Sequence, residues 1–98
     1  MEILINNNEI IFKPEGEINL YNESLLKEEM INNLDDGIEV VVIDMINVEF
    51  VDSSGIGMFI YLNKFFRTKN KSFILRSVPG DVLKILRLGM IDKIIKIE

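Results

Sequence analysis

The sequence predicts a single α/β domain spanning residues 1–98, with a mixed sheet of about five strands and helices packed mainly on one face. Strand-like and helix-like segments alternate along the chain, with short connections and no linker or internal repeat. Apolar residues make up 48% of the 98 residues, which suits one core and leaves no room for a second. The expected order is ββαβαβαβ, and the successive β-α-β units should be parallel and right-handed.

The first segment predicts a pair of strands. Residues 3–5 and 10–12 are rich in isoleucine, and three asparagines separate them. Asparagine favours turns, so the two runs are typical of strands joined by a tight connection. Pro14 and Gly16 should then end the regular pairing.

The first helix is expected from about Tyr21 to Asp35. Within it, Leu26, Met30 and Leu34 recur every four residues, as on the buried side of an amphipathic helix. Asn19 or Asn22 should cap its start, and the Asp35-Asp36-Gly37 run should end it.

The middle of the chain predicts a strand covered on both faces, followed by the second helix. Residues 38–44 (IEVVVID) are apolar and mostly β-branched. Residues 45–52 are expected to be a connection in which Val48, Phe50 and Val51 pack inward. The second helix should run from about Ser53 to Thr68.

The C-terminal part predicts a strand, a third helix and a last strand. Ser72 to Arg76 forms the first of these. Pro79 suits the first turn of the helix, and Gly89 should end it. The last strand is expected from Lys93 to Ile97.

Charge and residue usage exclude several function classes. The net charge of −5 argues against nucleic acid or an anionic membrane as partners. Residues 64–71 hold the one basic cluster, which is expected to be the solvated end of a helix. The chain has no Cys and no His, which removes disulfides, zinc sites and thiol or imidazole catalysis. We therefore expect a protein that is not an enzyme and carries no cofactor or metal.

The N-terminus lacks the pattern of a secretory signal, and no apolar run exceeds that of residues 58–62. A cytoplasmic location is therefore expected. The acidic surface and the lack of a long coiled-coil repeat favour a monomer.

The segment Asp52-Ser53-Ser54-Gly55 stands out because it links a buried strand directly to the second helix. The simplest interpretation is helix capping, since three of these residues are strong helix starters. The functional interpretation is that Ser53 accepts a phosphoryl group. The positive end of the helix dipole would hold that group, and its charge would add to that of Asp52 and repel a docked partner.

Helical angles indicate which surface surrounds this segment. Gly55, Phe59, Leu62 and Phe66 fall on one side of the second helix, which we assign to the core. Gly57 and Lys64 point the opposite way, with Ile60 and Tyr61 on the shoulders. An apolar face this wide makes Gly57, Ile60, Tyr61 and Lys64 candidates for partner binding. The alternative is that a neighbouring helix buries Ile60 and Tyr61.

These residues resemble the STAS domains, and among them the bacterial anti-sigma factor antagonists. The resemblance covers nearly the whole chain and is most specific in the Asp-Ser-Ser-Gly-Ile-Gly run that follows a buried strand. It is carried by Gly16-Glu17-Ile18-Asn19, VVIDM, VDSSGIG and the C-terminal PGDVLKILRLGMIDKII.

The resemblance implies that Ser53 is the phosphorylation site, with Ser54 a secondary one. It implies a partner that is both an anti-sigma factor and a serine kinase, bound by the unphosphorylated form so that a sigma factor is freed. A serine phosphatase would reverse the modification, and ATP and Mg²⁺ would belong to the kinase. The candidate partner-binding residues are Asp52, Ser53, Gly55, Gly57, Ile60, Tyr61, Lys64 and Asn19.

Many members of this family have Asp where this chain has Asn19, and the lost charge bears on partner choice. Two other hypotheses stay open: an unphosphorylated scaffold or subunit of a signalling or transport complex, and a nucleotide-binding module. The second lacks both GxxxxGK[ST] and GxGxxG. A serine hydrolase is rejected, because no His is present to complete a triad.

Overall fold

The main sheet of the computed structural model, which describes all of residues 1–98, has five strands in the order β1-β2-β4-β6-β7. β1 is antiparallel to β2. The pairs β2–β4, β4–β6 and β6–β7 are all parallel, as predicted. The strands are β1 Glu2–Asn6, β2 Glu9–Lys13, β4 Val40–Asp44, β6 Ser72–Arg76 and β7 Lys96–Ile97.

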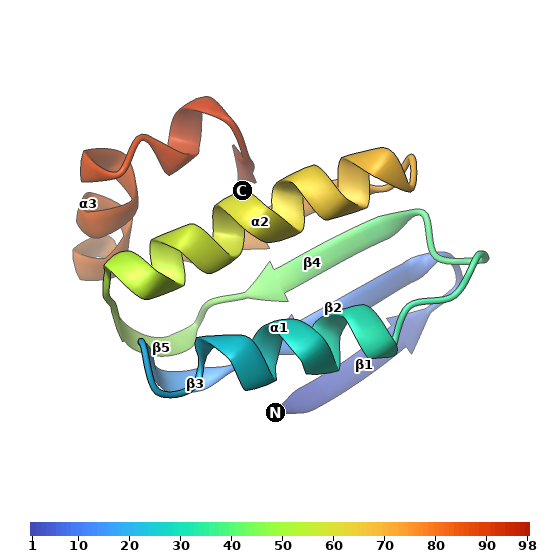
Figure 1. Ribbon diagram of the computed structural model, residues 1–98, viewed down its shortest axis with the longest axis horizontal. Helices are drawn as coiled ribbons and strands as arrows, with labels where there is room; N and C mark the ends of the chain where they lie inside the picture. Colours follow the sequence, from blue (N-terminus) through green and yellow to red (C-terminus); the bar gives the residue numbers. More distant parts are fainter.

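The helices are α1 Glu23–Asn32, α2 Ser53–Thr68 and α3 Gly80–Leu88, followed by the 3₁₀ turn η1 Ile91–Lys93. α1 and α2 contact each other and lie in front of the same face of the sheet (Figure 1). α3 lies at one end of the molecule, beside the start of α2. Both the predicted fold class and the predicted order of the main elements are confirmed.

A second, two-stranded sheet was not expected. β3 Glu15–Ile18 pairs in parallel with β5 Asn47–Val51, so the segment after Pro14 and the connection before α2 are both extended. The register of this pair shifts between Gly16 and Glu17, which places Phe50 opposite Glu17. Phe50 is therefore 46% exposed, and the expectation that it packs inward is wrong.

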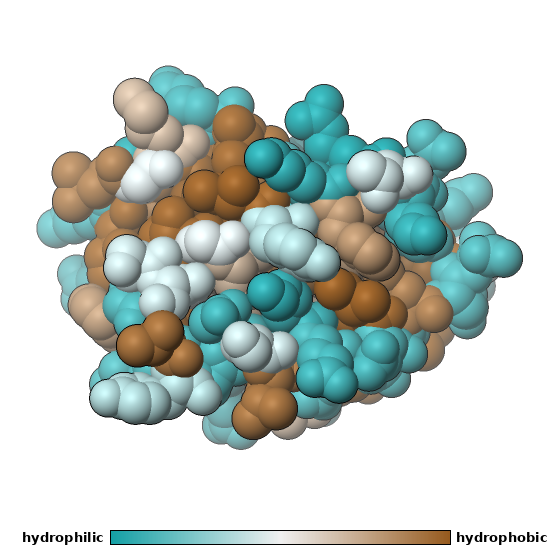
Figure 2. Space-filling view, viewed as in Figure 1, coloured by the Kyte–Doolittle hydropathy of each residue, from teal (hydrophilic) through white to brown (hydrophobic).

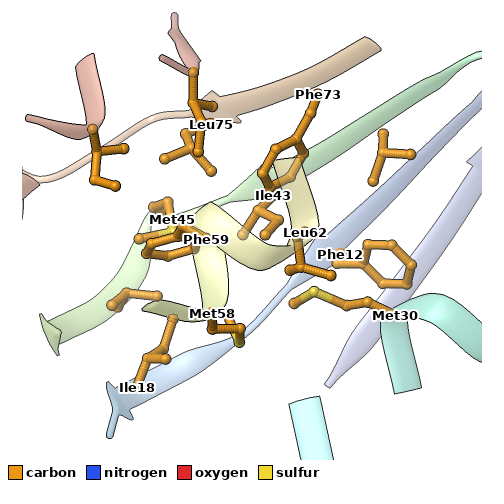
Figure 3. Packing of buried hydrophobic residues seen from close by; sticks show 14 of the residues in the cluster. Phe12, Ile18, Met30, Ile43, Met45, Met58, Phe59, Leu62, Phe73 and Leu75 are labelled. Atoms are coloured by element: carbon orange, nitrogen blue, oxygen red, sulfur yellow. The ribbon is translucent and has the colours of Figure 1, made fainter. Parts of the chain in front are cut away.

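The core lies between the main sheet and the helices (Figure 3). Strand residues alternate between the two faces, so every second side chain of β2, β4 and β6 enters this layer. Phe66 of α2 meets Phe73 of β6 edge-on, with ring centroids 5.1 Å apart. The fully buried large side chains include Phe12, Met30, Ile43, Met58, Phe59, Leu62 and Leu75.

Several element boundaries differ from the predictions, among them the end of α1 at Asn32 instead of Asp35 and the start of β4 at Val40 instead of Ile38. α1 begins at Glu23 because the side chain of Asn22 turns back and donates a hydrogen bond to the carbonyl of Glu17 (2.7 Å). The last strand begins at Lys96, because the N–H groups of Ile94 and Ile95 bond back to the carbonyl of Ile91 and keep that segment turned.

Candidate functional site

α2 starts at Ser53 because Asp52 caps it. The backbone of Asp52 is extended, and its Oδ1 accepts a hydrogen bond from the N–H of Gly55 at 3.0 Å. This contact satisfies one of the amides that a helix start leaves without a partner. The backbone N–H groups of Ser53 and Ser54 have no acceptor within the chain.

The other oxygen of the same carboxylate fixes a loop from a distant part of the sequence. Oδ2 of Asp52 accepts a hydrogen bond from the N–H of Leu20 at 3.1 Å, and the N–H of Asp52 donates to the carbonyl of Ile18. The loop between β3 and α1 is thus held beside the start of α2. Both carboxylate oxygens of Asp52 accept hydrogen bonds from backbone N–H groups of this chain. The side chain therefore holds the loop and the start of α2 in place.

Asn19 also forms hydrogen bonds within this loop. Its Oδ1 accepts from the N–H of Tyr21 at 3.0 Å, and its own N–H donates to Oδ1 of Asn22 at 2.9 Å. These bonds shape a tight turn that leaves Leu20 66% exposed and Tyr21 90% exposed. Asn19 lies close to the start of α2, because its neighbours Ile18 and Leu20 both bond to Asp52, and its own contacts orient the loop.

Ser53 is exposed at the first position of α2, and Ser54 beside it is half-buried. The Ser53 hydroxyl is therefore open to solvent at the end of the helix where backbone amides and the helix dipole favour negative charge. The burial that would have excluded a kinase from Ser53 is not observed.

Gly55 corrects one of the predicted partner contacts. It is buried, and a Cβ placed there would lie 2.6 Å from Cγ1 of Val51 and 2.9 Å from the carbonyl oxygen of Ile18. The helix backbone thus sits directly on β3 and β5, leaving no room for a side chain or a partner. Gly55 therefore lets α2 pack closely on the two strands, in agreement with the helical angle, which placed this residue on the core side.

The other predicted contacts follow α2 away from Ser53. Gly57 and Lys64 are exposed, and a Cβ on Gly57 would meet no atom within 4 Å. Ile60 is half-buried against the core. Tyr61 is 49% exposed, with Nζ of Lys27 4.4 Å from its ring centroid. The alternative that a neighbouring helix buries both Ile60 and Tyr61 is wrong for Tyr61, because about half of this residue stays exposed.

Sequence reasoning missed two apolar flanks of this site. Leu20 and Tyr21 form one flank, and their position depends on the long-range bond to Asp52. Leu88 and Met90 are exposed at the end of α3, where Gly89 packs against Ile56 of α2. Figure 2 shows hydrophobic atoms gathered above α2, between it and α3. Together with the exposed residues of α2, these flanks frame Ser53.

The site contains polar, apolar and hydroxyl groups and no arrangement suited to a metal. No group of three or more acidic side chains is placed to hold a cation. None of the helices is both long and apolar enough to cross a membrane.

Comparisons with known proteins give a family and a set of similar folds. A model of the STAS domain matches residues 1–98. A candidate anti-sigma factor antagonist from Thermotoga maritima is 26% identical; the match covers 98% of this chain and 83% of that one, with a TM-score of 0.84. An anti-sigma factor antagonist from Mycobacterium paratuberculosis is 18% identical, with 98% and 81% covered and a TM-score of 0.85.

The same fold occurs in a different setting. The STAS domain of a SulP transporter from Vibrio cholerae is 14% identical, with 94% of this chain and 71% of that chain covered and a TM-score of 0.74. At such low identity, this likeness and the mycobacterial one show a shared fold and nothing further.

Proposed function

Because this chain belongs to the STAS domain family, we propose that it is an anti-sigma factor antagonist whose partner binding is switched by phosphorylation of Ser53. One observation carries the proposal: the Ser53 hydroxyl is exposed at the start of α2, while two backbone hydrogen bonds fix the half-buried carboxylate of Asp52 beside it. The likeness to the Thermotoga maritima protein supports the same role.

In the unphosphorylated form, the surface around Ser53 binds the anti-sigma factor. The exposed Leu20 and Tyr21 supply apolar contact area on one side, and Ile56 with Leu88 and Met90 supplies it on the other. Aromatic side chains and methionine are enriched at protein interfaces, so Tyr21 and Met90 suit such a surface. Gly57 allows the partner to approach the helix backbone closely, and binding releases the sigma factor.

Phosphorylation changes the charge of this surface without unfolding it. A phosphoserine carries about −1.5 to −2 charges, and a helix start accommodates such a group. Because Asp52 has no freedom to turn away, the two negative groups lie together at the centre of the binding surface. Like charge brought against a docked partner costs several kcal/mol, so we expect affinity to fall about a hundredfold or more.

The kinase is the anti-sigma factor itself, and a serine phosphatase restores the binding form. ATP and Mg²⁺ belong to the kinase, because this chain needs to supply only the hydroxyl and the docking surface. The protein acts in the cytoplasm under this proposal.

The test combines labelling and binding with an anti-sigma kinase from the same cells. Wild type should take up one phosphoryl group from ATP, Ser53→Ala none, and Ser54→Ala as much as wild type. Ser53→Asp should weaken partner binding about tenfold, because it adds one charge where phosphate adds more. Labelling that persists in Ser53→Ala would refute the site. Binding unchanged in Ser53→Asp would favour a scaffold that phosphorylation does not regulate.

A further inference from the structure

β1 is the one long edge strand of the main sheet that nothing covers. It pairs with β2 on one side only, and it lies at the lower border of the molecule in Figure 1, away from α3. Its middle residues are apolar, with Leu4 45% exposed and Ile5 62% exposed. The opposite edge, β7, has only two residues. Exposed apolar edges invite pairing with another strand, and proteins usually protect them.

The backbone groups of β1 that point outward can be assigned from the hairpin. Asn6 and Glu9 close a two-residue turn, so they form a hydrogen-bonded pair, and such pairs alternate along an antiparallel ladder. Leu4 therefore bonds to β2, while the N–H and C=O groups of Ile3 and Ile5 face away from the sheet. These outward groups are spaced as a further antiparallel strand requires.

The sequence of β1 is complementary to itself in that arrangement. With a two-fold axis through Leu4, Ile3 of one copy meets Ile5 of the second copy, and Leu4 meets Leu4. Glu2 meets Asn6, so no like charges face each other. In this register, Ile3 and Ile5 of one copy, whose backbone groups face outward, pair with Ile5 and Ile3 of the second copy. These two pairs give roughly four backbone hydrogen bonds.

Side chains on the face of the sheet that carries no helix agree with this pairing. Leu4 lies opposite Ile11 on the face of the sheet that carries no helix, and Ile11 in turn lies opposite Val42 and Val42 opposite Ile74. This apolar row ends at the exposed edge. A second copy would continue the row across the two-fold axis and cover Leu4.

We infer that two copies of this chain associate through β1, antiparallel and centred on Leu4, to form one continuous sheet. This replaces the expectation of a monomer. The interface contains none of the residues that frame Ser53, so the association is independent of the proposed phosphorylation. Ser53→Asp should leave it unchanged.

Single cysteines test the register directly, because the chain has no native Cys. Two Leu4→Cys residues would face each other as a non-hydrogen-bonded pair, with Cα atoms about 4.5 Å apart, within the range of a disulfide. Glu2→Cys is the matched control on the same strand and the same face. In the proposed register its two copies lie roughly 13 Å apart.

Under mild oxidation, Leu4→Cys should become a covalent dimer at least tenfold faster than Glu2→Cys. Wild type should be dimeric by sedimentation at millimolar concentration, and Leu4→Lys should weaken the dimer about tenfold by placing like charges on the axis. Leu88→Lys, an equally apolar exposed position elsewhere, should not. A monomer at millimolar concentration, or equal cross-linking of both cysteine variants, would overturn the inference. Dimers that Leu4→Lys leaves intact would assign the contact to another surface.

Discussion

Gly55 and Gly57 lie two residues apart on α2, and replacing each with alanine should change stability in opposite directions. At Gly55 the new methyl group would lie 2.6 Å from Val51 and 2.9 Å from the carbonyl oxygen of Ile18. At Gly57 it would meet nothing within 4 Å. Both substitutions remove the same conformational freedom from the unfolded chain, so the pair isolates the effect of packing.

The magnitudes follow from two terms. Alanine is favoured over glycine inside a helix by about 1 kcal/mol. Overpacking costs about 1–3 kcal/mol, and the upper end applies at Gly55 because a backbone oxygen cannot rotate out of the way. Gly57→Ala should therefore raise the free energy of unfolding by about 1 kcal/mol. Gly55→Ala should lower it by about 2 kcal/mol.

Thermal and urea unfolding, followed by circular dichroism, would measure both changes. For a domain of this size, the melting temperature should rise roughly 5 °C for Gly57→Ala and fall roughly 10 °C for Gly55→Ala. Equal shifts for the two variants, or a stabilised Gly55→Ala, would refute the close contact between α2 and the β3–β5 pair.

The same pair separates stability from binding. Gly57→Ala adds a methyl group to the surface that we assign to the partner. It should weaken partner binding even though the domain is more stable, while kinase labelling of Ser53 remains possible. Unchanged affinity in Gly57→Ala would remove Gly57 from the interface.

The remaining predictions concern the cap and the core. Asp52→Ala loses the helix cap and the bond to Leu20, worth about 1 kcal/mol each, so chemical unfolding should show a loss of about 2 kcal/mol. Asp52→Asn should lose about half as much, because an amide offers one acceptor oxygen to the N–H groups of Leu20 and Gly55; equal losses would contradict this geometry. Phe59→Ala should cost about 3–5 kcal/mol, and the exposed Phe50→Ala less than about 1 kcal/mol. Similar losses for the two phenylalanines would contradict their assigned burial.

The sequence predicts α2 and its two faces because the signals there are local. Asp52 is a strong cap, and successive residues turn by about 100° around a helix, which places Gly55 inward and Gly57 outward. The strands of the main sheet are predictable for the same reason: β-branched runs with turn residues between them. The position of Ser53 at the start of α2 follows from the Asp52 cap and from the strand pattern that precedes it.

The remaining features depend on contacts between distant residues. Leu20 is placed by a hydrogen bond to a residue 32 positions later, which no local pattern reveals. The exposure of Phe50 depends on a register shift between the strands β3 and β5. Composition alone does not predict that these two segments pair. Leu88 flanks the site because α3 ends against Ile56, and that is a property of the packed structure.

The tether between Asp52 and the preceding loop uses the backbone N–H of Leu20 and no atom of its side chain. Any residue except proline offers that N–H. Relatives that keep the aspartate can therefore diversify the two most outward-pointing side chains of this turn while the turn itself stays in place. Changes at these two positions can therefore alter which partner binds each paralogue, while every paralogue still folds.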